Sequence, residues 1–306
     1  MSLAELAKLN DTRYSEGEFS DLTQDAPVLR EIEAIPASNG MSHRYYRTTT
    51  ASSAGFRAID AGLIKTKAGR TAVDVTMEVI DGTFTVDIAE AEAAAMGVDA
   101  YLEKEQNEAL KTLFSNLEKQ LFYGTGTGGD SDGFAGLADD ALFNALADDR
   151  VLSKGGSTVD SQTSVWAVRS NPEGFALVLG KDGNMVYSED PQIVNVYEDP
   201  TTDAKSYAAY QVPIIGYGGI QVGAKLDVAR LANVETALTD DDLSQLVELF
   251  DNDPTHIFMS KKARRLLQTS RTATTATGAA VPRPTDHDGI PIIATNSLIN
   301  TEAVVA

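Results

Sequence analysis

The apolar positions of the chain predict one long amphipathic helix with strand-rich segments on both sides of it. Between residues 98 and 123, apolar side chains recur every three or four positions: Leu102, Ala109, Leu110, Leu113, Phe114, Leu117 and Leu121. This spacing places them on one face of a helix. About 25 residues at about 1.5 Å each make a rod of roughly 38 Å. The rod ends at Gly124, a residue type that commonly follows the last helical turn.

Before this helix, the pattern predicts an arm followed by a long hairpin. Residues 1–43 are mixed in character and indicate an extended or partly helical arm with little core of its own. Apolar and polar residues then alternate as in strands, most clearly at 73–79. Because residues 52–70 contain Gly, Lys and Arg with few large apolar side chains, residues 44–86 are interpreted as a two-stranded hairpin with a polar tip. An isolated hairpin is marginally stable in water, so we expect it to lie on an external surface.

After the helix, the pattern predicts strands and then two short helices. Strands are expected at residues 165–168, 175–179, 212–220 and 222–231. Thr239 is a candidate cap for a helix that begins with three aspartates, and Ser260 for a second helix that runs through Leu267. Between these helices, residues 257–259 indicate a short strand, and residues 269–285, rich in Thr, Ala and Pro, indicate a loop.

Charge and composition exclude several classes of protein. The 306 residues include 25 Lys and Arg against 45 Asp and Glu, which gives a net charge of −20. This charge argues against a protein that coats nucleic acid, since such binding depends on basic side chains. The absence of cysteine excludes disulfides, thiolate nucleophiles and Cys-ligated metals. We expect no signal peptide and no membrane partner, because the sequence shows neither a leader pattern nor a long apolar run.

The glycine cluster at residues 124–129 formally matches the GxGxxG pattern of dinucleotide-binding loops. That motif requires a strand before it and a helix after it. Here a helix precedes the cluster, and Asp130 and Asp132 would place negative charge where a pyrophosphate should lie. A flexible loop is the favoured interpretation.

Other candidate sites are weak. Residues 130–133 resemble part of a calcium loop, but Gly128 and Asp139 occupy its two end positions, so the pattern is incomplete. One alternative left open is a metal-dependent hydrolase that uses Asp130, Asp132 and Asp139. A glycosidase pair among the many carboxylates is also open, although nothing singles one out. The nucleophile motif GxSxG is absent.

The histidines and the basic residues carry no clear chemistry either. His43, His256 and His287 have no partner at metal-ligand spacing, and His287 between two aspartates is interpreted as a solvated turn rather than a cation site. The dense basic cluster at residues 261–265 is interpreted as a solvated helix face, with contact to an acidic neighbouring chain as the alternative. We therefore predict no catalytic residue, no cofactor and no metal, and the chain is not expected to be an enzyme.

Several short motifs nevertheless occur in a recognisable order. They are Gln120-Leu121-Phe122-Tyr123-Gly124, Phe134-Ala135-Gly136-Leu137, Ile257-Phe258-Met259-Ser260 with the following helix, and Asp288-Gly289-Ile290-Pro291-Ile292-Ile293. With the arm, the hairpin and the long helix, this series resembles tailed-phage major capsid proteins of the HK97-like fold. The stretch 207–233 resembles the subgroup typified by the capsid protein GP7.

The resemblance implies an α+β HK97-like architecture. Its parts would be an N-terminal arm (1–43), an extended loop (44–86), a peripheral domain (87–236) with a spine helix at about 98–123, and an axial domain (237–306). The Asp288–Ile293 motif lies almost at the end of this sequence, so residues 151–236 would supply peripheral strands earlier than in many relatives. The short segment before the hairpin implies a separate scaffolding protein or none.

The resemblance also implies a function. Identical subunits would form the pentamers and hexamers of an icosahedral shell that encloses phage double-stranded DNA without binding it tightly. The protein would be assembled in the host cytoplasm, with a portal among its partners, and located in the virion. The expected intersubunit contacts lie on the hairpin: Phe56, Arg57, Lys65, Lys67 and Arg70. An encapsulin-like compartment shell, which shares the fold, is the alternative within this structural class.

Overall fold

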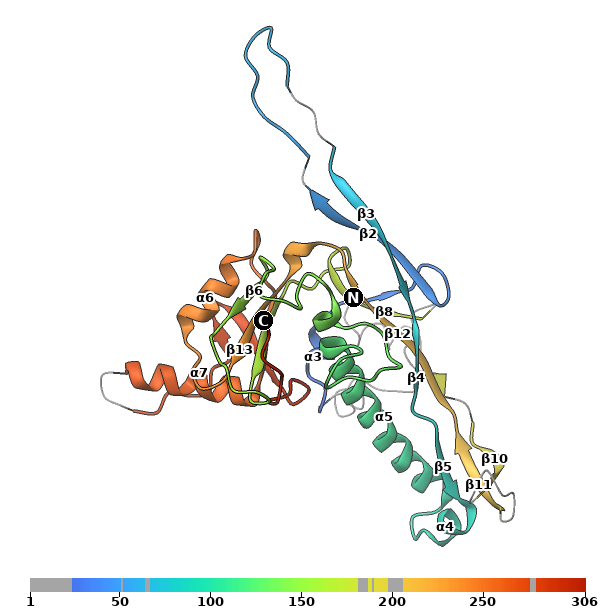
Figure 1. Cartoon of the computed structure of the whole chain (residues 1–306). Helices are drawn as coiled ribbons and strands as arrows, with labels where there is room; N and C mark the ends of the chain where they lie inside the picture. Colours follow the sequence, from blue (N-terminus) through green and yellow to red (C-terminus); the bar gives the residue numbers. More distant parts are fainter. Residues whose placement is uncertain are drawn as a thin grey trace.

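The computed structural model describes residues 24–50, 52–63, 67–180, 187–188, 190–197, 206–275 and 279–306. A long helix, α5 (Val98–Tyr123), runs beside extended strands, a hairpin projects from one end of this body, and a second lobe carries two further helices (Figure 1). The helix predicted for residues 98–123 is confirmed at both ends. Within the part of the chain described, no helix is long and apolar enough to cross a membrane.

The apolar stripe of α5 explains its position. Leu110, Leu113, Leu117 and Leu121 are buried in the main core of the molecule. Nearer the start of the helix, Leu102 packs in a smaller cluster with residues of the short helix α4 (Ile88–Ala93) and the strand before it. The stripe is therefore buried along most of the helix, as its periodicity predicts.

Two sheets lie along α5. The first has the order β1-β8-β12-β4, and β9 also pairs with β12; the strands are β1 (Ala34–Pro36), β8 (Phe175–Leu179), β12 (Ile214–Val222), β4 (Glu78–Asp81) and β9 (Tyr187–Ser188). The second has the order β10-β11-β5, with β10 (Gln192–Tyr197), β11 (Ser206–Val212) and β5 (Phe84–Asp87). The β10–β11 pair was not predicted.

The second lobe is built on a six-stranded sheet of order β15-β16-β14-β7-β13-β6. Its strands are β15 (Asp286–His287), β16 (Ile290–Thr295), β14 (His256–Ser260), β7 (Thr163–Val168), β13 (Val228–Val234) and β6 (Val151–Ser153). Helices α6 (Asp240–Glu248) and α7 (Lys261–Thr274) share a hydrophobic cluster with Val165 and Ala167 of β7. The next residues along that strand, Trp166 and Val168, belong to the main core instead. This alternation puts helices on one face of the sheet and the main core on the other.

The same sheet draws on two segments that the sequence separates. Strands β6, β7 and β13 come from residues 151–234, and β14, β15 and β16 come from residues 256–295. The boundary predicted between residues 236 and 237 therefore falls inside one hydrogen-bonded sheet. Periodicity identifies strands but does not show which distant strands pair. The sequence therefore could not show that strands on the two sides of residue 236 form one sheet.

The predicted arm of residues 1–43 is only partly described, and the described part lies in the main core. Helix α3 (Val28–Glu31) buries Val28 and Leu29, and β1 pairs in parallel with β8. Residues 26–36 thus pack as part of the body rather than as an arm, because their few apolar side chains fill space beside α5. Residues 1–23 lie outside the described residues.

The hairpin consists of β2 (Ser42–Thr50) and β3 (Gly69–Thr76), which pair antiparallel and project from the body (Figure 1). The predicted range, 44–86, extends beyond this pairing. The alternation of residues continues after Thr76, but the partners change: β4 pairs with β12, and β5 pairs with β11. Residues 78–87 therefore belong to the two sheets of the body.

Helix α7 is longer than predicted. The sequence indicated a helix through Leu267 and a loop from residue 269, whereas α7 continues to Thr274. The hydroxyls of Thr269 and Thr272 donate to the carbonyls of Arg265 and Gln268, four residues earlier. The threonine hydroxyls are thus satisfied within the helix, which continues through a segment whose low helix propensity indicated a loop.

Candidate functional site

The root of the projecting hairpin is fixed by three side chains from one face of β2. His43 and Tyr45 are buried, and Arg47 is half-buried. His43 Nδ1 accepts a hydrogen bond from the amide of Ser38 at 3.2 Å, so the proton lies on Nε2, which is 2.7 Å from Gln221 Oε1. The Tyr45 hydroxyl accepts from the amide of Val222 at 3.3 Å. Both contacts join the hairpin to the end of β12.

Arg47 extends this anchor to the loop that follows α5. Its Nε donates to the carbonyl of Val222 at 3.0 Å, and its Nη2 lies 2.7 Å from Asp140 Oδ2. Both side chains of this ion pair are mostly shielded from water, with exposed fractions of 17% and 18%. The root of the hairpin is thus held by directional contacts to two separate parts of the body.

The tip of the hairpin has the opposite character. Phe56 is fully exposed and the exposed fraction of Ile59 is 92%. Of the basic residues predicted to make contacts, Arg57, Lys67 and Arg70 are exposed, and Lys65 lies outside the described residues. Residues 52–70 contain four Lys and Arg and one Asp, a net charge of +3 in a chain of net charge −20. Two large apolar side chains, Phe56 and Ile59, are thus exposed close together in sequence among cations, which makes the tip a candidate contact surface.

Between the root and α5 lies the glycine-containing loop of residues 124–136, which is folded rather than flexible. The amide of Gln120 spans it: Nε2 donates to the carbonyl of Phe134 at 2.7 Å, and Oε1 accepts from the amide of Asp130 at 2.7 Å. Gly124 has φ of +55°, a left-handed conformation that favours glycine. The prediction of a flexible loop is therefore wrong, because Gln120 supplies contacts that loop composition alone does not reveal.

Asp139 closes this loop from the other side. Its Oδ2 accepts from the amide of Thr125 at 2.6 Å and from the Thr125 hydroxyl at 3.0 Å. A Cβ on Gly136 would lie only 2.3 Å from the amide nitrogen of Gly124, so the two segments touch through their backbones. The residues of the motifs at 120–124 and 134–137 thus have a structural role: they shape the turn between α5 and the root of the hairpin.

The structure gives no support to the hydrolase alternative. Asp139 directs its carboxylate to backbone and hydroxyl donors, and Asp130 accepts from the amide of Asp132 at 3.1 Å. Among the described residues, no group of three His, Asp or Glu side chains is arranged to hold a metal ion. These aspartates shape the turn and are not gathered around a common centre.

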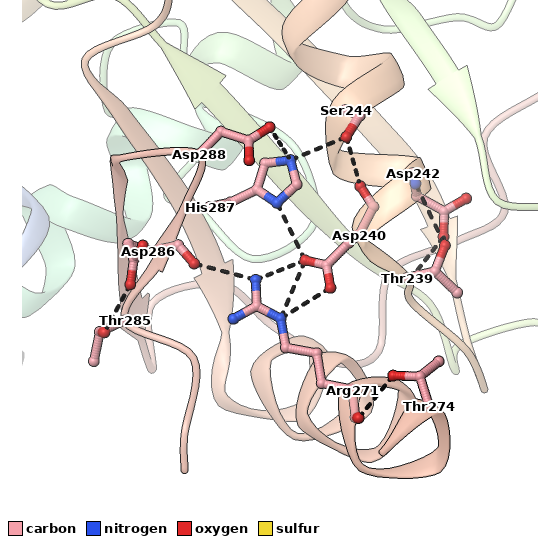
Figure 2. Close-up of polar contacts among 10 residues, drawn as sticks. All are labelled: Thr239, Asp240, Asp242, Ser244, Arg271, Thr274, Thr285, Asp286, His287 and Asp288. Atoms are coloured by element: carbon pink, nitrogen blue, oxygen red, sulfur yellow. Dashed lines mark hydrogen bonds and ion pairs between the residues drawn. The ribbon is translucent and has the colours of Figure 1, made fainter. Parts of the chain in front are cut away.

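A polar cluster joins α6, α7 and β15 in the second lobe (Figure 2). Asp240, at the start of α6, lies 2.6 Å from Arg271 Nη2 and 3.1 Å from His287 Nδ1. The hydrogen bond from Arg271, opposed by partial burial, lowers the pKa of Asp240. His287 is buried, so the interpretation of a solvated turn is wrong for this residue. In the basic cluster of residues 261–265, Lys261 and Arg265 are exposed as predicted, whereas Lys262 is half-buried and donates to the carbonyl of Ser161 at 2.7 Å.

The order Ser244, His287, Asp240 in this cluster superficially resembles that of a catalytic triad. Ser244 Oγ lies 3.2 Å from His287 Nε2. The serine is on the second turn of α6, however, and its hydroxyl donates to the carbonyl of Asp240 at 3.1 Å. The hydroxyl proton is therefore directed to the helix backbone, and the cluster acts as a clamp that holds β15 against the two helices.

A buried carboxylate connects α5 to both ends of the described chain. Glu118 is fully buried, with Oε2 accepting from the amide of Val28 at 2.8 Å and Oε1 accepting from the hydroxyl of Thr295. Burial raises the pKa of Glu118 to about 7, although these hydrogen bonds act in the opposite direction. Glu118 therefore holds α3 and the end of β16 on α5.

A second buried group fixes the residues after β16. Glu302 accepts from the Tyr123 hydroxyl at 2.6 Å and lies 3.1 Å from Arg230 Nη2. Burial, reinforced by the Glu302 carboxylate, raises the pKa of Tyr123. The end of α5, β13 and residue 302 are thereby joined in the interior.

Sequence reasoning identified the tip but missed the residues that fix it. Tyr45 and Arg47 share one face of the predicted hairpin, whereas His43, which the structure places on the same face of β2, was assigned to the arm. Their partners Gln221 and Asp140 lie more than 90 positions away in the chain, so no local pattern could have indicated them.

Comparison with known proteins shows which family and which solved structures this chain is similar to. A model of the family described as "Major capsid protein GP7" matches residues 19–306. No curated protein sequence matches the chain.

Among solved structures, a chain of bacteriophage Epsilon15 superimposes with a TM-score of 0.66 at 17% identity, covering 90% of this chain and 88% of that one. The capsid of bacteriophage JBD30 superimposes with a TM-score of 0.52 at 10% identity, covering 95% and 98%. At these identities the similarity establishes the fold, which is the HK97-like fold expected from the sequence.

Proposed function

The chain belongs to the GP7 family of major capsid proteins, and on that premise we propose that its hairpin links identical subunits into the pentamers and hexamers of an icosahedral shell. The protein is a shell-forming capsid protein of bacteriophage type.

The projecting hairpin is the observation that carries this proposal. Its root is held by His43, Tyr45 and Arg47, while Phe56 at its tip is fully exposed among the described residues. A rigidly rooted element with an uncovered apolar tip is suited to contact a second subunit. A single exposed ion pair contributes at most about 1 kcal/mol. Repeating the contact around a closed shell multiplies its effect.

Charge supports an enclosed genome that is not tightly bound. The chain carries a net charge of −20, and a surface of that sign repels packaged DNA. We therefore propose that the shell encloses phage double-stranded DNA in the virion, after assembly in the host cytoplasm with a portal and a separate scaffolding protein. We also propose that the chain has no catalytic activity, since Asp139 is committed to the loop backbone.

Light scattering after size exclusion, with electron microscopy of large particles, tests the shell-forming arrangement. We expect pentamers, hexamers or closed shells from the full chain, alone or with co-expressed scaffolding protein. The variant Phe56→Ser with Ile59→Ser should remain folded but lose assembly, because both residues are exposed in the single subunit. A matched control is Val159→Ser, which replaces an exposed apolar residue outside the hairpin. A chain that stays monomeric with scaffolding protein would overturn the proposal.

A co-purifying cargo protein in particles formed without other phage proteins would favour the encapsulin-like alternative. The hydrolase alternative predicts binding of a divalent metal that is lost on Asp132→Asn. We expect no such binding, since Asp130 and Asp139 direct their carboxylates to groups of the loop itself.

A further inference from the structure

Strand β10 forms one edge of the sheet β10-β11-β5, at the end of the body away from the second lobe (Figure 1). Among the described residues it pairs with β11 alone. An edge strand presents a row of backbone N–H and C=O groups on its outer side. The outer side of β10 can therefore bind a further strand.

Strand β10 lacks the features that usually protect an edge strand, which are short length, charged side chains and proline. It has six residues, Gln192–Tyr197, and none of them is charged or is Pro or Gly. The strands of the hairpin are longer, but each of them carries arginine. The other described edge strands of the three larger sheets have only two to four residues each: β1, β4, β5, β6 and β15. Among the strands described, β10 is therefore the one long edge without a charge to keep another strand away.

One face of β10 is a largely apolar strip that extends past the helices. Ile193, Asn195 and Tyr197 lie on this face, because successive residues of a strand alternate. The exposed fractions of Ile193 and Tyr197 are 66% and 48%. On the neighbouring strand, Tyr210 lies directly opposite Ile193 and packs against the smaller hydrophobic cluster at the start of α5. This face is thus packed against helices at its inner strands and exposed at β10.

The sequence of β10 is complementary to itself in an antiparallel arrangement. When Asn195 is placed opposite Asn195 of a second copy, Ile193 lies opposite Tyr197, and Val194 lies opposite Val196. Aromatic and β-branched side chains form favourable cross-strand pairs, and the two asparagine amides can share a hydrogen bond. A register centred on Val194 would instead oppose Ile193 and Asn195, and a shift by one residue would turn the side chains to the other face. The register centred on Asn195 therefore matches apolar with apolar side chains.

Resting on the proposed shell, we infer that β10 pairs antiparallel with β10 of a second copy about a two-fold axis centred on Asn195. The two three-stranded sheets then form one continuous sheet. Both copies contribute the same residues, so the contact closes as a pair and cannot generate a pentamer or hexamer ring. It therefore joins subunits of neighbouring rings. Each copy has a net charge of −20, and a contact through uncharged residues avoids repulsion between them.

Disulfide trapping tests this inference directly, because the chain has no cysteine of its own. Directly opposed residues of antiparallel strands have Cα atoms about 4.5–5.5 Å apart, within the limit of about 7 Å for a disulfide. Assembled Asn195→Cys protein should therefore give covalent dimers, and no larger species, in denaturing gels without reductant after oxidation. The matched control is Ser206→Cys, an exposed position on β11. Three strand spacings of about 4.8 Å, roughly 14 Å in all, would separate its two copies, so it should give no dimer.

Charge at the two-fold position provides a second readout. Asn195→Lys and Asn195→Asp each place two like charges directly opposite one another, which disfavours strand pairing. Either variant alone should form pentamers and hexamers but reduce the fraction of chain in closed shells at least tenfold. Co-expression of the two variants should restore closed shells, since lysine then faces aspartate. Ser206→Lys, which adds a charge on the next strand, should assemble as the wild type does.

The outcomes distinguish this contact from the proposed function. Closed shells of Asn195→Cys protein that contain no covalent dimer, or normal shells of Asn195→Lys, would overturn the inference and leave the proposed shell intact. Hydrogen exchange that slows in β10 on assembly, while no Asn195→Cys dimer forms, would assign the edge to a different partner and also overturn the inference. A wild-type chain that forms neither rings nor shells with scaffolding protein would instead overturn the proposed function.

Discussion

Arg47 and Asp140 form an ion pair of 2.7 Å that links strand β2, at the root of the hairpin, to the loop beyond α5. The pair is unusual among the ion pairs of the hairpin because water has little access to it. By comparison, Arg44 and Asp74 form a pair of 2.5 Å between β2 and β3, but both side chains are more than half exposed. The two arginines, three residues apart on the same strand, therefore allow a matched comparison.

We predict that Arg47→Ala lowers the free energy of unfolding by about 1–3 kcal/mol, because Asp140 and the carbonyl of Val222 lose a charged partner. Arg44→Ala should change it by less than about 1 kcal/mol, as expected for an exposed pair. Urea unfolding measures both values. Hydrogen exchange should show faster exchange in β2 and β3 for Arg47→Ala only. Equal effects of the two substitutions would contradict the role given to Arg47.

Glu118 predicts a pH dependence of stability. Its pKa is about 7 in the folded protein, against an ordinary value of 4.5, so the folded state binds the proton more tightly. The stabilisation is fully present below about pH 4.5 and is lost as the pH rises to about 7. A difference of about 2.5 in pKa corresponds to about 3 kcal/mol. Urea unfolding at a series of pH values measures this slope.

The control for Glu118 is its neutral isostere. Glu118→Gln should remove this part of the slope between pH 4.5 and 7, while the contributions of other groups remain in both proteins. Glu103→Gln, at an exposed position on the same helix, should leave the slope unchanged. Identical slopes for wild type and Glu118→Gln would show that Glu118 keeps an ordinary pKa.

Gly136 is predicted to tolerate no side chain. A Cβ at this position would lie 2.3 Å from the amide nitrogen of Gly124 and 2.5 Å from the carbonyl oxygen of Gln120, both backbone atoms that cannot move aside alone. We expect Gly136→Ala to lower the free energy of unfolding by about 3 kcal/mol or more. Gly62→Ala, with no atom within 4 Å of the added Cβ, should be neutral. Thermal unfolding of the two variants distinguishes close backbone packing from a loop that adapts.

Arg271 is predicted to stabilise the end of α7 through Asp240. Because the Asp240 side chain is 44% exposed, solvent screens the pair, and we expect Arg271→Ala to cost only about 1 kcal/mol. The lowered pKa of Asp240 means that this contribution is present above its ordinary value of 3.8 and is lost at lower pH. The exposed Arg265→Ala is the control. Faster hydrogen exchange at residues 286–287 in Arg271→Ala alone would support the clamp.

Much of the fold could be predicted because local patterns determine it. The stripe from Leu102 to Leu121 predicted α5, and the caps Thr239 and Ser260 mark the starts of α6 and α7 as expected. The alternation around Val73 predicted the hairpin, although not the residue at which its strands part. In each case the information lies within a few residues of the element itself.

The remaining features depend on residues far apart in the sequence. Gln120 makes a folded turn of a glycine-rich segment, and the buried His287 has its polar partners, Asp240 and Ser244, more than 40 positions away. A surface cavity of about 170 Å³ is lined by α5, β4 and the loop of residues 130–134, and no single stretch of sequence contains its shape. The exposed tip of the hairpin could be predicted from its own composition. The contacts that hold its root could not, because the partners of His43 and Arg47 lie far away in the sequence.

The strand order of the second lobe has a consequence for synthesis of the chain. Strand β7 lies between β14 and β13, and β16 lies beyond β14, so the sheet remains incomplete until residue 295 has left the ribosome. Glu118 and Tyr123 likewise wait for Thr295 and Glu302. Pairing over such distances is slow compared with local folding. The hairpin segment is therefore synthesised well before the body can be completed, and the time at which a subunit becomes competent to join its neighbours depends on residues 295–302.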